Sequence, residues 1–122
     1  MAKICISQLD HVALHVTNVD DSVTFYRQTI GLEQMDRPDF DFPGAWFRLG
    51  ETQELHLVGG RKHDVQSHHR GTHFAVRVTD IEAVQTRLES KSAEFIRKHR
   101  PDGAHQIFTT DPDGHWIEFC KV

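Results

Sequence analysis

The chain has 122 residues, of which 26% are charged and 38% hydrophobic, and its formal net charge is −4 with a pI near 6.2. These values are typical of one ordinary globular domain, and they give no reason to expect nucleic acid or an anionic membrane as a partner. There is no apolar run of membrane-span length, no signal-peptide core and no metal-type cysteine spacing, so we expect a cytoplasmic protein.

The first predicted element is a strand in LDHVALHV, residues 9–16, where apolar and polar residues alternate strictly. Alternation places Val12, Leu14 and Val16 on one face, and His11, Ala13 and His15 on the other. A helix is predicted next in NVDDSVTFYRQTI, residues 18–30, with Asn18 as N-cap and Gly31 just beyond its end.

Three strands and a loop follow this helix. The strands are predicted in LEQMDR, GAWFRLG and QELHLVG, at residues 32–37, 44–50 and 53–59. In the last of them Leu55 and Leu57 face the helix, whereas Glu54, His56 and Val58 face away. Residues 61–70 are polar and aperiodic, which is typical of a connecting loop.

The second half follows the same plan. It reads as a strand in residues 71–78, a helix in residues 80–91 with Asp80 as N-cap, and strands in residues 93–99, 105–111 and 115–120. The turn sequence DPDG precedes the last strand, which carries Glu118 among apolar residues. Trp116, Glu118 and Cys120 then share the face opposite Ile117 and Phe119.

The two halves align without a gap at an offset of 62 residues. DHVALHVTNVDD lies over THFAVRVTDIEA, and ELHLV lies over WIEFC, so His11 meets His73 and His56 meets Glu118. Such self-similarity indicates an internal duplication. We therefore predict one domain, 1–122, with a βαβββ module at 7–60, a connector at 61–70 and a second βαβββ module at 71–122.

Four side chains share the face opposite the helices: His11, His56, His73 and Glu118. If the modules curl into a partial barrel, the four can converge inside it. Three imidazoles and a carboxylate suit a divalent transition metal, whose charge would compensate the buried Glu118. For any single histidine, a hydrogen bond inside the cleft is the simpler explanation, but the internal symmetry of the set favours a metal site.

LDHVALHVTNVDDSVTFYRQTIGL, GTHFAVRVTDI and DPDGHWIEF resemble the vicinal oxygen chelate superfamily of glyoxalases, bleomycin resistance proteins and extradiol dioxygenases. The resemblance implies an α+β fold, in which two tandem βαβββ modules form a U-shaped, partly open mixed β-barrel around a metal, commonly in a homodimer. The ligand positions of the family fall on His11, His56, His73 and Glu118. Glyoxalase I usually has Glu where His56 stands, so Glu118 is the one carboxylate of that kind here.

The resemblance favours a metal-dependent lyase or isomerase of the glyoxalase type, acting on a small substrate whose neighbouring oxygens bind zinc, nickel, iron, cobalt or manganese. Glu118 is the candidate catalytic residue, and His15, Arg77 and Trp46 are candidate substrate contacts. Three alternatives stay open: a fosfomycin-type thiol transferase, an extradiol-type dioxygenase and a drug-binding protein. A fourth protein ligand at His56 would occupy a position that the dioxygenase needs for oxygen.

Overall fold

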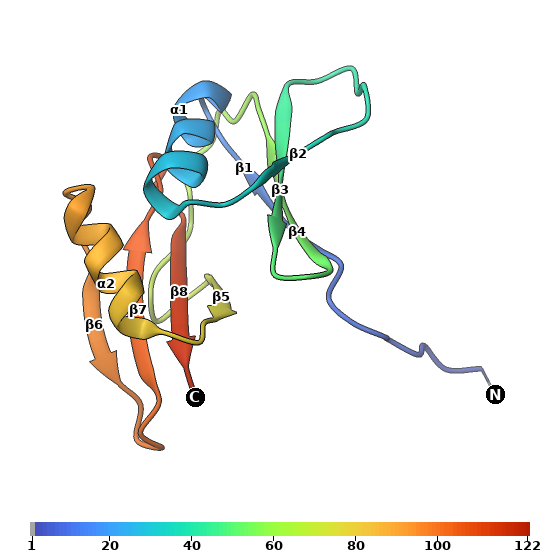
Figure 1. Ribbon diagram of the computed structural model, residues 1–122. Helices are drawn as coiled ribbons and strands as arrows, with labels where there is room; N and C mark the ends of the chain where they lie inside the picture. The colour runs from blue at the N-terminus through green and yellow to red at the C-terminus, as the bar shows by residue number, and fades with distance from the viewer. Residues whose placement is uncertain (1) are drawn as a thin grey trace.

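The computed structural model describes residues 2–122 and divides them into two similar halves (Figure 1). The first half contains β1 (His11–His15), α1 (Val19–Thr24), η1 (Phe25–Ile30), β2 (Gln34–Met35), β3 (Gly44–Leu49) and β4 (Gln53–Val58). The second half contains β5 (Phe74–Arg77), α2 (Ile81–Ser90), β6 (Ile96–His99), β7 (His105–Thr110) and β8 (Trp116–Lys121). The predicted α+β fold of two tandem βαβββ modules is confirmed.

Each helix begins at the predicted capping residue. The side chain of Asn18 accepts a hydrogen bond from the backbone N–H of Asp21, and that of Asp80 accepts one from Ala83, both at 3.1 Å. The first helix widens into the π-helical turn η1 and ends at Gly31, whose φ of +91° suits glycine. The sequence predicted the extent of this helix but not its change of winding.

Each half forms its own four-stranded mixed sheet, in the strand orders β1-β4-β3-β2 and β5-β8-β7-β6. The first strand of each half runs parallel to the last, and the other pairs are antiparallel. Val12 lies opposite Leu55 and Phe74 lies opposite Ile117, so the 62-residue repeat extends to the strand register. The sheets do not close into a barrel, because β1 and β5 are each an edge strand of their own sheet.

Each helix covers one face of its own sheet and buries the apolar residues of the alternating pattern. Around α1 and η1 the core includes Leu14, Val16, Tyr26, Phe47, Leu55 and Leu57, and around α2 it includes Ile81, Leu88, Ile107, Ile117 and Phe119. Burying each large aliphatic side chain contributes about 1.5–3 kcal/mol. The predicted assignment of faces is confirmed at these positions.

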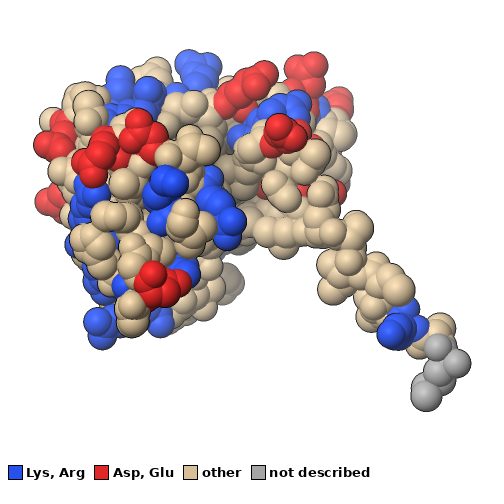
Figure 2. Space-filling view, turned by 60° about the horizontal axis from the view of Figure 1, so that its bottom comes forward, with Lys and Arg blue, Asp and Glu red and all other residues tan. Residues whose placement is uncertain are grey.

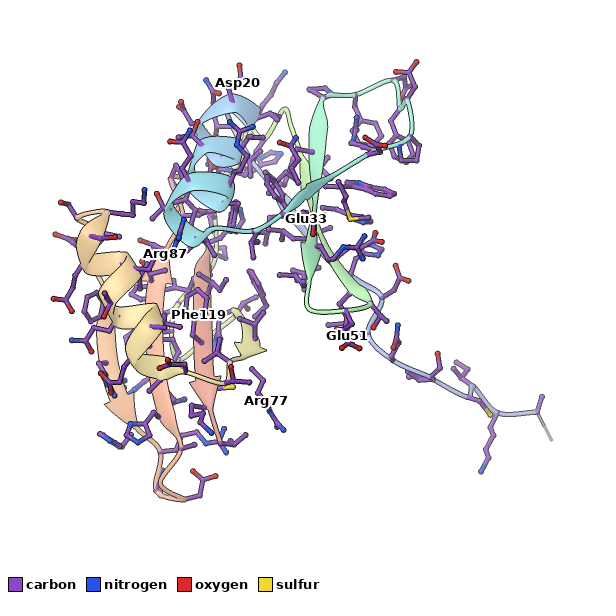
Figure 3. All side chains as sticks on the ribbon, in the orientation of Figure 1. Asp20, Glu33, Glu51, Arg77, Arg87 and Phe119 are labelled. Atoms are coloured by element: carbon purple, nitrogen blue, oxygen red, sulfur yellow. The ribbon has the colours of Figure 1, made fainter. Side chains whose placement is uncertain are left out.

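The two halves meet on the sides that carry their helices. Arg87 of α2 donates from Nε to the carbonyl of Thr29 and from Nη2 to that of Gln28, at 2.9 and 2.8 Å, and so satisfies carbonyls at the end of η1 (Figure 3). A second junction joins Arg61 Nη2 to Asp113 Oδ1 at 2.7 Å. These contacts fix how the sheets sit relative to each other.

Residues 2–10 form an extended arm that stands away from the body (Figures 1 and 2). Its large apolar side chains are strongly exposed: Ile4 by 90%, Ile6 by 84% and Leu9 by 64%. Among residues 2–122, no helix has the length and apolar character needed to cross a membrane.

Candidate functional site

The candidate site residues lie on the faces that the helices leave uncovered. In the first sheet, register places Ala13, His56 and Trp46 in one row across β1, β4 and β3, with His11 and Glu54 in the next row. In the second sheet the matching row holds Ala75, Glu118 and Phe108. Each uncovered face thus carries a small alanine beside an aromatic ring and polar side chains.

In the second module, His73 and Glu118 form a direct pair. His73 Nε2 lies 3.0 Å from Glu118 Oε1, and Gln106 Nε2 donates to the other carboxylate oxygen at 3.0 Å. His73 Nδ1 lies 3.0 Å from the carbonyl of Gly71, which can only accept, so this nitrogen carries a proton. The Glu118 side chain is only 8% exposed, so its carboxylate is largely shielded from water.

In the first module, His11 and His56 stack instead of forming a hydrogen bond. Their ring centroids are 4.1 Å apart and their planes differ by 16°. His11 Nδ1 lies 2.8 Å from Asp10 Oδ2, and His56 Nε2 lies 2.9 Å from Glu54 Oε1. The His56 ring also stacks on the ring of Trp46. The two ring centroids are 3.9 Å apart and the planes differ by 3°.

One chain therefore presents two pairs of candidate ligands. Over residues 2–122, no group of three or more His, Cys, Asp or Glu side chains is placed to hold a metal ion. Within one chain, the expected convergence on a common ion does not occur for His11, His56, His73 and Glu118. The physical reason is the docking of the modules through α2 and η1, which keeps His11 and His56 on the first sheet and His73 and Glu118 on the second.

The three predicted substrate contacts lie in different surroundings. His15 Nε2 is 3.1 Å from the carbonyl of Gly59, and the residue lines a cavity of about 390 Å³ that also borders His73 and Trp116. Arg77 is exposed at the end of β5 and points away from the body (Figure 3). Trp46 is half-buried and stacks on His56.

Three polar residues of these faces were not singled out from the sequence: Asp10, Glu54 and Gln106. Each bonds to a candidate ligand: Asp10 to His11, Glu54 to His56 and Gln106 to Glu118. Glu54 was assigned to the correct face but to no role. Strand parity, extended to every polar residue of the uncovered faces, would have found Glu54 and Gln106, because side chains two residues apart share a face.

The chain belongs to the Glyoxalase/Bleomycin resistance protein/Dioxygenase superfamily, whose sequence profile matches residues 8–119. It is 30% identical to a lactoylglutathione lyase of Neisseria meningitidis, over 93% of this chain and 90% of that protein. It is 29% identical to the glutathione transferase FosA of Serratia marcescens, over 93% and 79% of the two chains. The crystal structure of a putative glyoxalase family protein from Bacillus anthracis superposes with a TM-score of 0.87 at 28% identity, covering 98% of each chain.

Proposed function

We propose that this protein is a metal-dependent lyase or isomerase of the glyoxalase type, acting on a small substrate that presents two neighbouring oxygens. The observation that carries the proposal is the pair of His73 and Glu118, with Gln106 holding the second carboxylate oxygen. The similarity to a lactoylglutathione lyase supports the class of reaction.

The chemistry of this pair fits a cation. His73 donates the proton on Nδ1 to the carbonyl of Gly71. In a neutral His73 ring, Nε2 therefore carries a lone pair, and this lone pair faces Oε1 of Glu118 at 3.0 Å. Two facing lone pairs repel, and a cation or a proton between them removes the repulsion. Imidazole nitrogen and carboxylate oxygen are ligands of divalent zinc, nickel, iron, cobalt and manganese. Gln106 and the Gly71 carbonyl are the outer contacts that orient such ligands.

A second copy of the chain completes the site in this proposal. His11, in the other module, has its Nδ1 bonded to Asp10, and its Nε2 has no hydrogen-bond partner among residues 2–122. The uncovered face of one copy would then supply His11, and that of its partner would supply the pair. A homodimer is supported by the open edges of β1 and β5 and by the exposed arm residues Ile4, Ile6 and Leu9.

When bound, the metal would supply Lewis-acid stabilisation of negative charge on the substrate oxygens. Glu118 is the group proposed to accept and return the proton of the adjacent carbon, since general bases of this kind are carboxylates or histidines held at the reacting atom. Trp46 gives an aromatic wall beside the site, and Phe40 extends it with a ring centroid 6.1 Å from that of Trp46. His15 and Arg77 are proposed to contact the polar part of the substrate.

Two measurements test this proposal. Purified protein is expected to bind a divalent metal and to turn over the hemithioacetal of methylglyoxal and glutathione in a metal-dependent manner. Absence of turnover in a protein that binds metal would remove the glyoxalase reaction and direct the search to other substrates with neighbouring oxygens.

The sharing of the site between chains has its own test. Co-expressed His11→Ala and His73→Ala chains form mixed dimers in which one of the two shared sites is intact and the other has lost both histidines. Each variant alone is expected to lose tight metal binding, and the mixed dimer is expected to regain half of the wild-type metal content. If the ligands came from one chain, mixing would restore nothing.

A fosfomycin-type thiol transferase is the second candidate. The similarity to FosA favours it, and so does Lys98, which lies opposite Gln106 in the register and holds its ammonium 5.8 Å from the Phe108 ring centroid. A cation on this face would attract an anionic substrate. A screen with fosfomycin and thiols, and with catechols for the extradiol alternative, would separate these reactions. Binding without turnover would favour the drug-binding alternative.

A further inference from the structure

The ring of His56 is held on three sides. It stacks on Trp46 with a centroid distance of 3.9 Å and an interplanar angle of 3°, and on His11 with values of 4.1 Å and 16°. Its Nε2 lies 2.9 Å from Glu54 Oε1. The His56 side chain is 13% exposed and that of Glu54 is 26% exposed, so the pair is partly shielded from water. This environment restrains both the position of the ring and its rotation.

The hydrogen-bonding pattern of His56 is opposite to that of the other two histidines. His11 and His73 both use Nδ1 to reach an oxygen acceptor, at 2.8 and 3.0 Å, and leave Nε2 for another partner. His56 uses Nε2 instead. Because a carboxylate only accepts, the proton lies on Nε2, which cannot then bind a metal ion. Any lone pair of His56 lies on Nδ1.

The stacking geometry separates His56 further from the ion of the proposed site. A metal binds imidazole in the ring plane, about 2.0–2.1 Å from the nitrogen. The planes of His11 and His56 are nearly parallel and their centroids are 4.1 Å apart. Because the lone pairs of an imidazole lie in its ring plane, the ring nitrogens of these two stacked residues would not be directed at one common ion. A shared ion would require His56 to leave Trp46, Glu54 or both.

We infer that His56 is a positioning residue and not a metal ligand: Glu54 and Trp46 fix its ring, and the ring packs against His11 and orients it. This inference rests on the proposed function. The proposed metal then has three protein ligands, His11 of one copy with His73 and Glu118 of the other. A metal ion held by these three residues would keep open positions for the substrate oxygens. With His56 outside the ligand set, no fourth protein ligand would occupy a position that a substrate or oxygen needs.

Metal binding by ring-preserving and ring-deleting variants tests the inference. His56→Phe keeps the stack but has no nitrogen, and we expect its metal affinity to stay within about tenfold of wild type. His56→Ala removes the stack, and we expect a loss of about 10–100-fold, the size typical of outer-shell changes. His11→Phe is the matched control and should abolish tight binding. Equal losses in His56→Phe and His11→Phe would overturn the inference.

Two spectroscopic measurements do not depend on turnover. The visible absorption of the Co²⁺-loaded protein reports the ligand set, and we expect it to be the same in wild type and His56→Phe. A changed spectrum would overturn the inference. In metal-free protein, ¹⁵N NMR should find His56 protonated at Nε2, and Glu54→Leu should abolish this preference.

These outcomes separate the inference from the proposed function. A wild-type protein that binds no divalent metal would remove the proposed function, whereas the NMR result would still decide whether Glu54 holds His56. Conversely, a metal-binding wild type in which Nδ1 of His56 carries the proton would leave the metal site in place and overturn the role assigned to His56.

Discussion

The hydroxyl of Tyr26 donates a hydrogen bond to Oδ2 of Asp111 at 2.9 Å, linking η1 of the first module to the turn before β8 of the second. Tyr26 is fully buried and Asp111 is 5% exposed. The other oxygen of Asp111 accepts from the backbone N–H groups of Asp113 and His115, both at 2.9 Å. This carboxylate therefore ties the turn to the helix that packs on the other sheet.

Replacing Tyr26 with Phe should lower the free energy of unfolding by about 1.5–3 kcal/mol, because it leaves Oδ2 of Asp111 buried without a donor. The substitution keeps the ring, so packing is preserved. Urea denaturation of wild type and Tyr26→Phe measures the difference. A change below about 0.5 kcal/mol would show that water replaces the hydroxyl at no cost.

Alkaline titration should report the same contact. Burial, and then the nearby carboxylate of Asp111, raise the pKa of Tyr26 well above its ordinary value. The folded state thus keeps a proton that the unfolded chain loses near pH 10, so the contribution to stability is complete below that pH and is lost as the pH rises through the folded-state pKa. Tyr26 is the single tyrosine. Phenolate absorbance should appear only together with unfolding seen by circular dichroism, and its appearance in the native protein near pH 10 would contradict this expectation.

Gly31 and Gly103 form a matched pair for testing the junction of the helices. Both have a φ near +90°, but a Cβ at Gly31 would lie 2.8 Å from Cζ of Arg87, whereas one at Gly103 would meet nothing within 4 Å. Gly103→Ala should cost about 1 kcal/mol for backbone strain alone. Gly31→Ala should cost more, and the excess should shrink when Arg87→Ala is added. Equal costs at the two glycines, measured by chemical denaturation, would mean that Arg87 moves aside freely.

Gln106 offers a test of the outer contacts of the candidate metal centre. Gln106→Leu removes the donor to Glu118 Oε2 and should weaken metal binding by about 10–100-fold, measured by competition with a chelator. Gln28→Leu, at an exposed position of η1, is the control. Unchanged affinity in Gln106→Leu would mean that Glu118 needs no help in holding its orientation.

The exposed arm should contribute to the proposed dimer. Ile4→Ser combined with Ile6→Ser is expected to shift the protein toward monomer in sedimentation velocity, because these side chains have large apolar surfaces that a partner can cover. Stability of the monomer fold should not change, since the two side chains are 90% and 84% exposed. Val122→Ser, at the exposed opposite terminus, should have no effect on association. An unaltered sedimentation profile of the arm variant would exclude the arm from the interface.

Much of the fold could be predicted because its determinants are local or repeated. Alternation along 11–16 and 54–58 fixed the buried faces, and Asn18 and Asp80 marked the helix starts. The 62-residue offset carried this assignment to the second sheet. The widening of the first helix at Phe25–Ile30 was not predicted, because no single residue in that stretch requires an extra residue per turn.

For the site, strand parity predicts only the face of the sheet on which each residue lies. Parity puts His56 and Glu54 on one face, but it does not fix a rotamer, and the rotamer decides whether His56 points to a metal or to Glu54. Nor does it say how two modules dock. The contact of Arg87 with Gln28 and Thr29 belongs to tertiary packing, and this packing separates the two candidate pairs within one chain.

The division of each sheet into a helix-covered face and an uncovered one has a consequence for how such a chain can diversify. Along β4, Leu55 and Leu57 are fully buried under the helix, whereas the intervening His56 lies with Glu54 on the face that no helix covers. Side chains on the uncovered face do not pack against the helix, so their exchange leaves the helix-covered core in place. Substitutions on the uncovered face can therefore change the chemistry of the site while the fold stays the same.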